Sequence, residues 1–579
     1  MPPRLRMERS RQCAEFEGKS PWMMVATFGL WLVTCCALGP SLWQVMQSCE
    51  HLHQFLIMVA FQLLLIVFWL LGAYYVCVVI FYFTETKTMN VTDQAECSCR
   101  ENLPPVAILY PTCDDFQVEA ILTCVRQDYP VFHVFILDDS QSENCRESVN
   151  DLRNRHPDKI TVVRRETRQG FKAGNLNHAL RGAAKDYPFF AVMDADERIP
   201  PSFLRDMASI LLRTNRAFVQ ANHAPNPAQS GAFAGILKQT ILPFWSVFLS
   251  TKNKHGFVPC VGHGVLIRRS AWEQVGGLPE VASEDLAFSA RLLEEGLRGC
   301  FARHVVCYED FPASLPAFKQ QQERYVLGVL QVLLREWPRL LRSAGASWIE
   351  KLDFFLCILP LYIPVLSLLF ILTAGLGLPL CFSRASIIVT ETPVGSIRIP
   401  FLQAFDGRFQ PMWKPLFVYP SLLFSISPAL PMLALALSGK IRKPFRLLVE
   451  SNVVYLSTML QLAWSLIGYI RSRRIRFIPT GSLVSSLVSM RSSGAMSPLT
   501  FWTFLFSLTT CVLLASSLNL GLAAVALCPL LGLTSSTGGR QLGAMAGIVF
   551  TCVLLQLMMG AALCNAPLSI PPLLFSVHF

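Results

Sequence analysis

The feature that most constrains this chain is one polar stretch set between long apolar segments. Six segments hold about 20 or more mostly apolar residues, enough to cross a hydrocarbon core about 30 Å thick. They are 22–46, 55–83, 352–381, 411–438, 500–533 and 542–564. Only 15% of the 579 residues are charged, against about 25% in an ordinary soluble protein. The sequence therefore predicts one polar domain, 84–351, inserted into a multi-pass helical membrane protein.

Basic residues gather beside the apolar segments. The clusters are Arg4, Arg6, Arg9 and Arg11; Lys440, Arg442, Lys443 and Arg446; and Arg471, Arg473, Arg474 and Arg476. The positive-inside rule accounts for them better than nucleic-acid binding does. We therefore expect the N-terminus (1–21), the polar domain and the C-terminal tail (565–579) on the cytosolic side of a plasma or inner membrane.

The same rule bears on a seventh apolar segment, 449–470. Basic loops flank it on both sides, so it cannot cross the membrane once if both loops are cytosolic. It also carries Glu450, Asn452 and Gln461. We expect an interfacial helix within a region 439–499, with a conventional seventh span as the alternative.

Strand-like and helix-like runs alternate in the polar domain. The expected strands are 106–110, 133–137, 160–163 and 189–193, and 117–126 is an expected helix. This alternation predicts an α/β domain with a mostly parallel sheet covered on both faces. Ligands bind such sheets at the carboxyl ends of the strands, where Asp138, Asp139, Asp194 and Asp196 follow strand runs.

These acids suit a nucleoside diphosphate with a divalent cation. Mg²⁺ or Mn²⁺ prefers oxygen ligands and needs only one or two carboxylates, which Asp194 and Asp196 offer. Lys172 offers a positive charge to a phosphate. Each has an ordinary alternative: a solvated loop for the two acids, and a surface lysine in a loop for Lys172.

Two later signatures suit the rest of a transfer reaction. Asp285, at the start of an expected helix, suits a general base, although Ser and Asp at such positions are also ordinary capping residues. Gln321 and Arg324 lie three apart and share a helical face, and Tyr325 offers a ring to a sugar. The alternative is the polar face of an amphipathic helix.

Together these segments resemble the processive family-2 glycosyltransferases of the cellulose synthase superfamily, and the bacterial cellulose synthase catalytic subunit among them. The resemblance covers about residues 104–340. The matching segments are Pro111–Asp114, Asp138–Ser140, Gly170–Asn177, Asp194–Asp196, Ser283–Asp285 and Gln321–Tyr325.

The resemblance implies a GT-A fold, a UDP-sugar donor, a divalent metal and inversion at the anomeric carbon. By position, uridine would be held by Thr112, Asp114, Asp138 and Asp139. The diphosphate would face Lys172 and Arg324, and Asp194 would serve the donor or the metal, with Asp196 on the metal. Asp285 would be the base, and the acceptor would meet Glu284, Gln321 and Tyr325. Phe477 and Thr480 resemble a gating loop.

The chain departs from the family pattern at several positions. Ser283 stands where threonine is usual, and Tyr325 stands where tryptophan is usual, which gives a smaller ring face. Ser482 occupies the gating-loop lysine position, so the sequence offers no lysine for a phosphate contact there. The segment Pro259–Gly264 is closer to the Gly-His-Asn type of bacterial glucan glucosyltransferases.

These observations predict an enzyme that extends a β-glucan from UDP-glucose and exports it through its membrane helices. UDP-N-acetylglucosamine or another hexose donor remains open. The expected partners are the UDP-sugar, the growing polysaccharide, membrane lipid and accessory export subunits. The rival hypotheses are a non-processive transferase acting on a lipid, and an inactive transporter or scaffold.

Overall fold

The computed structural model describes residues 20–85, 103–382, 384–392, 395–403, 407–441 and 443–472, with 507, 526–529 and 548 beyond them. The chain divides into two compact units. The sheet unit comprises Met1–Val25, Cys77–Leu361 and Ser465–Gly494. The helical unit comprises Ala26–Val76, Tyr362–Trp464 and Ala495–Phe579. The predicted gating-loop residues Phe477 and Thr480, and nearly all of the predicted spans 500–533 and 542–564, lie outside the described residues.

The sheet unit is built on seven strands in the order β3-β2-β1-β4-β6-β5-β7. Their bounds are β1 Val106–Thr112, β2 Phe132–Asp138, β3 Ile160–Val163, β4 Phe189–Val192, β5 Phe218–Pro225, β6 Val265–Arg268 and β7 Gly299–Glu309. Only β6 runs antiparallel to its neighbours, β4 and β5. The four strands predicted from the sequence are confirmed, as is the mostly parallel sheet.

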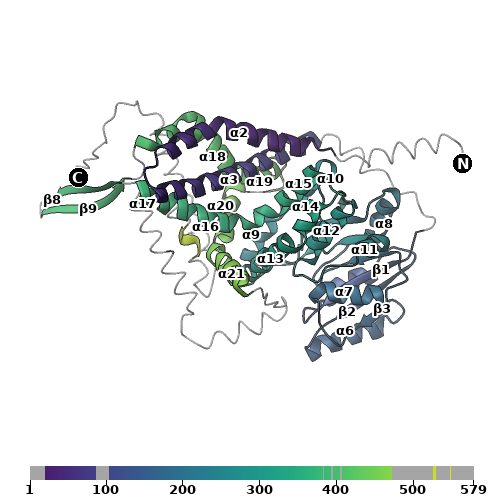
Figure 1. The fold of residues 1–579 in the computed structure, drawn as a ribbon. Coiled ribbons are helices and arrows are strands. Elements are labelled where there is room, and N and C mark those ends of the chain that lie inside the picture. The colour runs from purple at the N-terminus through teal and green to yellow at the C-terminus, as the bar shows by residue number, and fades with distance from the viewer. Residues whose placement is uncertain are drawn as a thin grey trace, which may run out of the picture. The chain divides into compact units, whose positions relative to one another are not determined.

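Both faces of the sheet are buried, which explains why the central strands are continuously apolar. Along β1, Val106, Ile108 and Tyr110 join the core on one face. Ala107 and Leu109 join the core on the other face. Figure 1 shows helices on the sheet, with α6 and α7 labelled beside β1–β3.

The helices of the sheet unit differ in how well the sequence predicted them. Their bounds are α5 Val118–Val125, α6 Glu143–Arg155, α7 Phe171–Arg181, α8 Phe203–Arg213, α9 Ala232–Thr240, η1 Phe244–Leu249, α10 Ser250–His255, α11 Arg269–Gln274, α12 Glu284–Glu294, α13 Leu315–Arg335, α14 Trp337–Arg342 and α15 Trp348–Ile358. The expected helix 117–126 is α5, and the helix expected at Asp285 is α12. The remaining strands, β5, β6 and β7, were not predicted, because short runs such as β6 resemble any apolar segment.

One continuous helical segment of the sheet unit, Ala232–His255, is long and apolar enough to cross a membrane. Its apolar residues have partners within the unit, since Trp245 and Leu249 are buried in the core on one face of the sheet. Near its end, Lys252 forms a fully buried ion pair with Asp353 of α15. Packing on the sheet unit therefore explains the apolar composition of this segment.

Among the residues that the structure describes, five further helical segments are also long and apolar enough to cross a membrane. They are Trp22–Gln47, Leu52–Thr84, Trp348–Phe382, Pro415–Leu437 and Pro444–Ser472. Four of them match predicted spans. The fifth contains the segment 449–470, and it is interrupted at Ser457 and Thr458 between α20 (Pro444–Leu456) and α21 (Met459–Ser472). Its interfacial position remains a prediction.

The other elements of this region follow in chain order. They are α2 Trp22–Gln47, α3 Leu52–Glu85, η2 Leu359–Tyr362, α16 Ile363–Phe370, η3 Ile371–Gly377, α17 Leu378–Phe382, β8 Arg384–Thr392, β9 Gly395–Gln403, η4 Gly407–Trp413, α18 Pro415–Ile426, η5 Ser427–Ala429 and α19 Leu430–Leu437. The antiparallel hairpin of β8 and β9 was not predicted from the sequence.

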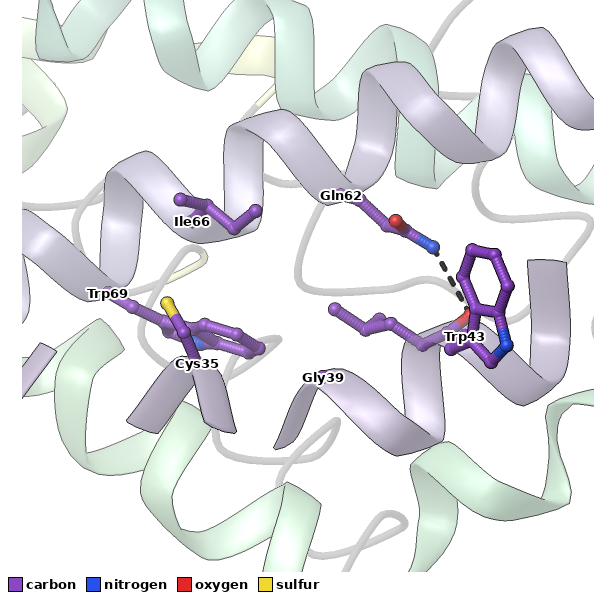
Figure 2. A pocket seen from close by; sticks show the side chains of 7 residues that line it. Cys35, Gly39, Trp43, Gln62, Ile66 and Trp69 are labelled. Atoms are coloured by element: carbon purple, nitrogen blue, oxygen red, sulfur yellow. Dashed lines mark hydrogen bonds between the residues drawn. The ribbon is translucent and has the colours of Figure 1, made fainter. Parts of the chain in front are cut away.

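Within the helical unit, α2 and α3 leave a pocket of about 110 Å³ between them. Gln62 donates a hydrogen bond to the Leu42 carbonyl (3.2 Å), and Trp69 closes the other side (Figure 2). Gly72 of α3 accommodates Phe424 of α18, because an added Cβ would lie 2.5 Å from that side chain. Close packing of small against large residues thus holds these helices together.

Candidate active site

The carboxyl end of β2 carries Asp138 and Asp139, both held by arginines. Asp138 pairs with Arg164 (2.8 Å) and accepts a hydrogen bond from the Ser140 amide (2.9 Å). Asp139 receives a two-pronged contact from Arg165, at 2.9 and 2.6 Å. Such bidentate pairs fix the orientation of the carboxylate. The predicted uridine contacts are therefore oriented by arginines that the sequence analysis missed.

The end of β1 supports this region. Asp114 adopts a positive φ of 63° and accepts hydrogen bonds from the amides of Gln141 and Ser142, both at 2.8 Å. Thr112 donates to Asp115 (2.9 Å). Asp114 thus ties the end of β1 to the loop that precedes α6, and this contact brings two of the predicted nucleotide residues next to Asp138 and Asp139.

A pocket of about 430 Å³ opens at this place. It is lined by Asp138, Asp139, Ser140, Gln141, Arg146, Arg164, Arg165, Glu166 and Arg168. Its volume lies within the range of small-molecule sites, and its lining mixes both charges. The pocket can hold a nucleoside between paired acidic and basic groups.

Lys172 lies in the first turn of α7 rather than in a loop. Its ammonium contacts Asp194 (2.5 Å) and the Gly262 carbonyl (3.0 Å), and lies 4.0 Å from Glu284. Burial opposes its charge, but the carboxylates of Asp194 and Glu284 outweigh burial and raise the pKa of Lys172. Lys172 and Asp194 therefore form an ion pair at this edge of the sheet, and the predicted phosphate contact of Lys172 stays a prediction.

Two asparagines of α7 form hydrogen bonds that hold this helix against neighbouring segments. Asn175 donates to the Leu137 carbonyl at the end of β2 (3.0 Å). Asn177 donates to the Leu278 carbonyl (2.8 Å) and accepts from the Trp272 indole (3.0 Å). In the segment Gly170–Asn177, Lys172 is thus the group that faces the acids, and the asparagines hold α7 in place.

Asp196, a predicted metal ligand, lies near other carboxylates. Burial, together with the nearby carboxylates of Asp194 and Glu309, raises the pKa of Asp196 to about 7. Carboxylates held this close repel one another, and a cation placed among them relieves the repulsion. Glu309 and Asp310, at the end of β7, were missed, and the Asp310 amide donates to Asp196 (3.3 Å).

A cluster of glutamate and histidine side chains adjoins the turn that carries Asp194 and Asp196. Glu197 contacts His223 of β5 at 2.7 Å, and both side chains are fully buried. His263 lies 3.7 Å from the same Glu197 oxygen. Burial opposes the imidazolium, but Asp194, Glu197 and Glu309 outweigh it and raise the pKa of His263 to about 10. The sequence carried no spacing signal for this group, because its members come from three separate segments.

Asp285 lies in the first turn of α12 and packs against a glycine. The side chain does not cap the helix; it accepts a hydrogen bond from the adjacent Leu286 amide (2.8 Å). A Cβ added to Gly262 would lie 2.9 Å from the Asp285 Cβ. Burial raises the pKa of Asp285, and burial with the nearby Asp285 carboxylate raises the pKa of Glu284 to about 7, against the lowering effect of Lys172. A carboxyl whose pKa is raised is a stronger base, which suits general-base catalysis.

Helix α13 brings the last signature to the same place. The Arg324 guanidinium lies over the Tyr325 ring at 5.7 Å, and Tyr325 is 37% exposed. Burial, with the carboxylates of Glu309, Asp194 and Asp285, raises the pKa of the Tyr325 hydroxyl. Tyr325 thus lies in the field of these carboxylates, and part of its side chain is exposed.

Other contacts place α13. Gly328 packs against Ser283 at the start of α12, where an added Cβ would lie 2.2 Å from the Ser283 hydroxyl oxygen. Glu323 accepts a hydrogen bond from Ser465 of α21 (2.7 Å). The end of the predicted interfacial helix thus contacts the helix that carries Gln321, Arg324 and Tyr325.

Part of the chain is similar to known proteins. Residues 189–437 match the family model described as glycosyl transferase family group 2. A probable glycosyltransferase of Sulfolobus acidocaldarius is 25% identical over 283 residues, which cover 47% of this chain and 59% of that protein. Glucomannan 4-beta-mannosyltransferase 7 of Arabidopsis thaliana is 22% identical over 357 residues, covering 57% and 62%. The chain thus spans about three fifths of the length of these relatives.

Among solved structures, the mannosyltransferase PcManGT from Pyrobaculum calidifontis is similar, with 18% identity and a TM-score of 0.41, covering 68% of this chain and 99% of that one. The mostly parallel sheet, with acidic residues at the strand ends, agrees with the GT-A fold expected from the sequence. Residues 189–437 are thus similar to glycosyl transferase family group 2, and the chain is similar to glucomannan mannosyltransferases of Arabidopsis thaliana. These matches do not single out bacterial cellulose synthase, and they do not confirm glucose as the donor sugar.

Proposed function

We propose that this protein is a membrane-embedded, inverting glycosyltransferase that extends a β-linked glycan from a nucleoside diphosphate sugar. The observation that carries the proposal is the meeting of Lys172, Asp194 and Glu284, with Asp285 beside Glu284 and covered by Gly262. A cation for phosphate, acids for a metal and a candidate base thus lie in one cluster.

On the donor side, the pocket beside Asp138 and Asp139 holds the nucleoside. The Lys172 ammonium neutralises phosphate oxygen. Asp196, with Asp194, would hold Mg²⁺ or Mn²⁺, which would supply positive charge beside the departing diphosphate. Arg324 adds a second fixed cation on this side.

On the acceptor side, Asp285 takes the proton from the acceptor hydroxyl, which attacks the anomeric carbon opposite the diphosphate. The open ring face of Tyr325 stacks on the acceptor sugar, and Gln321 and Glu284 offer hydrogen bonds to it. Because the attack comes from the face opposite the leaving group, the configuration at that carbon inverts.

The donor sugar is the least determined part of the proposal. UDP-glucose is the donor that the sequence motifs favour. The plant relatives are named as mannosyltransferases, so a mannosyl donor is a second candidate. Pocket shape decides between such sugars. The candidates are UDP-glucose, UDP-N-acetylglucosamine and GDP-mannose.

The membrane helices extend the proposal to export. We place the sheet unit on the cytosolic side, where nucleotide sugars are available, and the product leaves through the helical region. The Gln321–Tyr325 motif and the large membrane region after it are the support for processive extension. The metal is Mg²⁺ or Mn²⁺, and accessory export subunits are further partners.

The test is incorporation of labelled sugar by the purified protein in lipid nanodiscs, with each of the three donors and Mg²⁺, Mn²⁺ or EDTA. The variants are Asp285→Asn and, as a matched control, Asp151→Asn on the exposed side of α6. We expect long product from one donor, lost with EDTA and with Asp285→Asn and kept with Asp151→Asn. Short lipid-linked product would favour a non-processive enzyme. No product and no nucleotide binding with Mn²⁺ would favour the inactive scaffold.

A further inference from the structure

The carboxylate of Glu197 joins two separate segments of the candidate site. One oxygen contacts Nε2 of His223 at 2.7 Å. The other accepts hydrogen bonds from the Asp194 amide (3.2 Å) and the Gly264 amide (3.0 Å). The side chain is fully buried, so no water competes for these contacts. Hydrogen bonds to a buried carboxylate are among the strongest in proteins.

The two amides belong to the two sides of the proposed reaction. Asp194 contacts Lys172 and opens the turn that carries Asp196. Gly264 ends the loop Gly262–Gly264, whose first carbonyl accepts from Lys172 (3.0 Å). The same loop packs on Asp285 through Gly262. Glu197 is therefore the common support of the metal turn and of the loop that covers the candidate base.

The backbone around Glu197 is shaped for this contact. Gly264 has a positive φ of 54°, and a Cβ there would lie 2.4 Å from a Glu197 oxygen. Only glycine allows the loop to approach the carboxylate so closely. His223 is oriented in turn, since its ring packs on Trp245 with centroids 4.3 Å apart.

We propose that Glu197 is a positioning residue that sets the distance between the donor side and the acceptor side of the active site. This proposal rests on the proposed function. It predicts that loss of the carboxylate lowers turnover more than donor affinity, because the nucleoside pocket at Asp138 and Asp139 stays intact. A misplacement of about 1 Å costs roughly 10²-fold in rate.

A buried metal site is the competing explanation. Glu197, His223 and Cys307 offer ligand atoms within 4.8 Å of one another, and all three are buried. The hydrogen bonds favour the positioning role, because both Glu197 oxygens already accept from protein donors. The two explanations differ at Cys307, which a metal needs and a positioning contact does not.

The experiment compares Glu197→Ala, Glu197→Gln and Cys307→Ala in nanodiscs. It measures kcat and KM for the donor that the wild-type protein uses, together with bound metal and backbone amide exchange in peptides containing Asp194 and Gly264. Glu197→Asp replaces Glu197→Ala if that variant does not fold, because its shorter side chain does not reach both amides.

For Glu197→Ala we expect kcat to fall about 10²-fold with donor KM changed less than about threefold, and both peptides to exchange faster. Glu197→Gln keeps an oxygen for the amides, so we expect it to recover on the order of tenfold in kcat. Cys307→Ala should stay within about threefold of wild type and keep both peptides protected.

Three results would overturn the proposal. One is a folded Glu197→Ala protein with wild-type kcat and unchanged exchange at both peptides. The second is equal loss of kcat in Glu197→Ala and Cys307→Ala. The third is one bound metal per chain that Cys307→Ala removes. If the wild-type protein transfers no sugar, the proposed function fails, and the exchange comparison, which needs no substrate, still decides the role of Glu197.

Discussion

Replacing Gly262 by alanine tests whether the loop Gly262–Gly264 sets the position of the candidate base. The added Cβ would lie 2.9 Å from the Cβ of Asp285. Two carbons in contact prefer about 3.5–4.0 Å, so the loop or Asp285 must move by roughly 0.6–1.1 Å. A displacement of that size at a reacting group is expected to lower kcat about 10²-fold.

The substitution also strains the backbone, and this effect needs its own control. Gly262 has a φ of +82°, a conformation that costs an L-residue about 1–2 kcal/mol. Gly276 has a φ of +80° with nothing within 4 Å of an added Cβ. Gly276→Ala therefore carries the same strain without the contact on Asp285.

The assay measures kcat, donor affinity and thermal unfolding for both variants in nanodiscs. We expect both to lose similar stability, about 2–4 °C in Tm for each kcal/mol. Only Gly262→Ala should lose turnover, with nucleotide binding kept. Equal loss of turnover in the two variants, or wild-type turnover in Gly262→Ala, would refute the reasoning.

Three other predictions concern charge. Asp285→Asn should lower kcat by about 10² or more while nucleotide binding with Mn²⁺ is kept; wild-type turnover would remove it from the mechanism. Burial raises the pKa of Asp285 and, with the Asp285 carboxylate, raises the pKa of Glu284 to about 7. Because protonation removes the base, kcat/KM should fall with decreasing pH, with a midpoint above the ordinary carboxyl pKa of about 4. Asp353→Ala leaves the Lys252 charge buried without its carboxylate, which should cost about 3–5 kcal/mol of unfolding free energy, whereas Arg339→Ala, at a half-exposed ion pair, should cost less than about 1 kcal/mol.

The sign of the pH effect on stability is opposite to that on activity. A carboxyl whose pKa is raised on folding binds its proton more tightly in the folded state. The stabilising contribution of the pair Glu284 and Asp285 is therefore full below the ordinary carboxyl pKa values and is lost as the pH rises through the folded values. Thermal unfolding of the wild type and of Asp285→Asn between pH 4 and 8 measures this contribution. The Tm of Asp285→Asn minus the Tm of the wild type should become smaller as the pH falls. An increase of this difference as the pH falls would contradict the reasoning.

Local sequence predicted the strands and the acids at their ends. Apolar runs such as 106–110 and 133–137 are continuous because both faces of the sheet are buried, and an acid directly after such a run must lie at the carboxyl end. This rule alone brought Asp138 and Asp194 to one edge. Segments long enough to span a membrane were also predictable from the sequence, because a span needs about 20 apolar residues whatever surrounds it.

Other features depend on contacts between residues far apart in the chain. Arg165 orients Asp139, and Glu197 joins the Asp194 turn to Gly264, without any spacing that the sequence could reveal. The segment Ala232–His255 has the composition of a span, yet its core contacts and the pair of Lys252 with Asp353 place it in the sheet unit. Composition by itself determined which residues avoid water and which strand ends carry acid, whereas only tertiary structure decided which acid meets which cation, because those meetings depend on distances that folding creates.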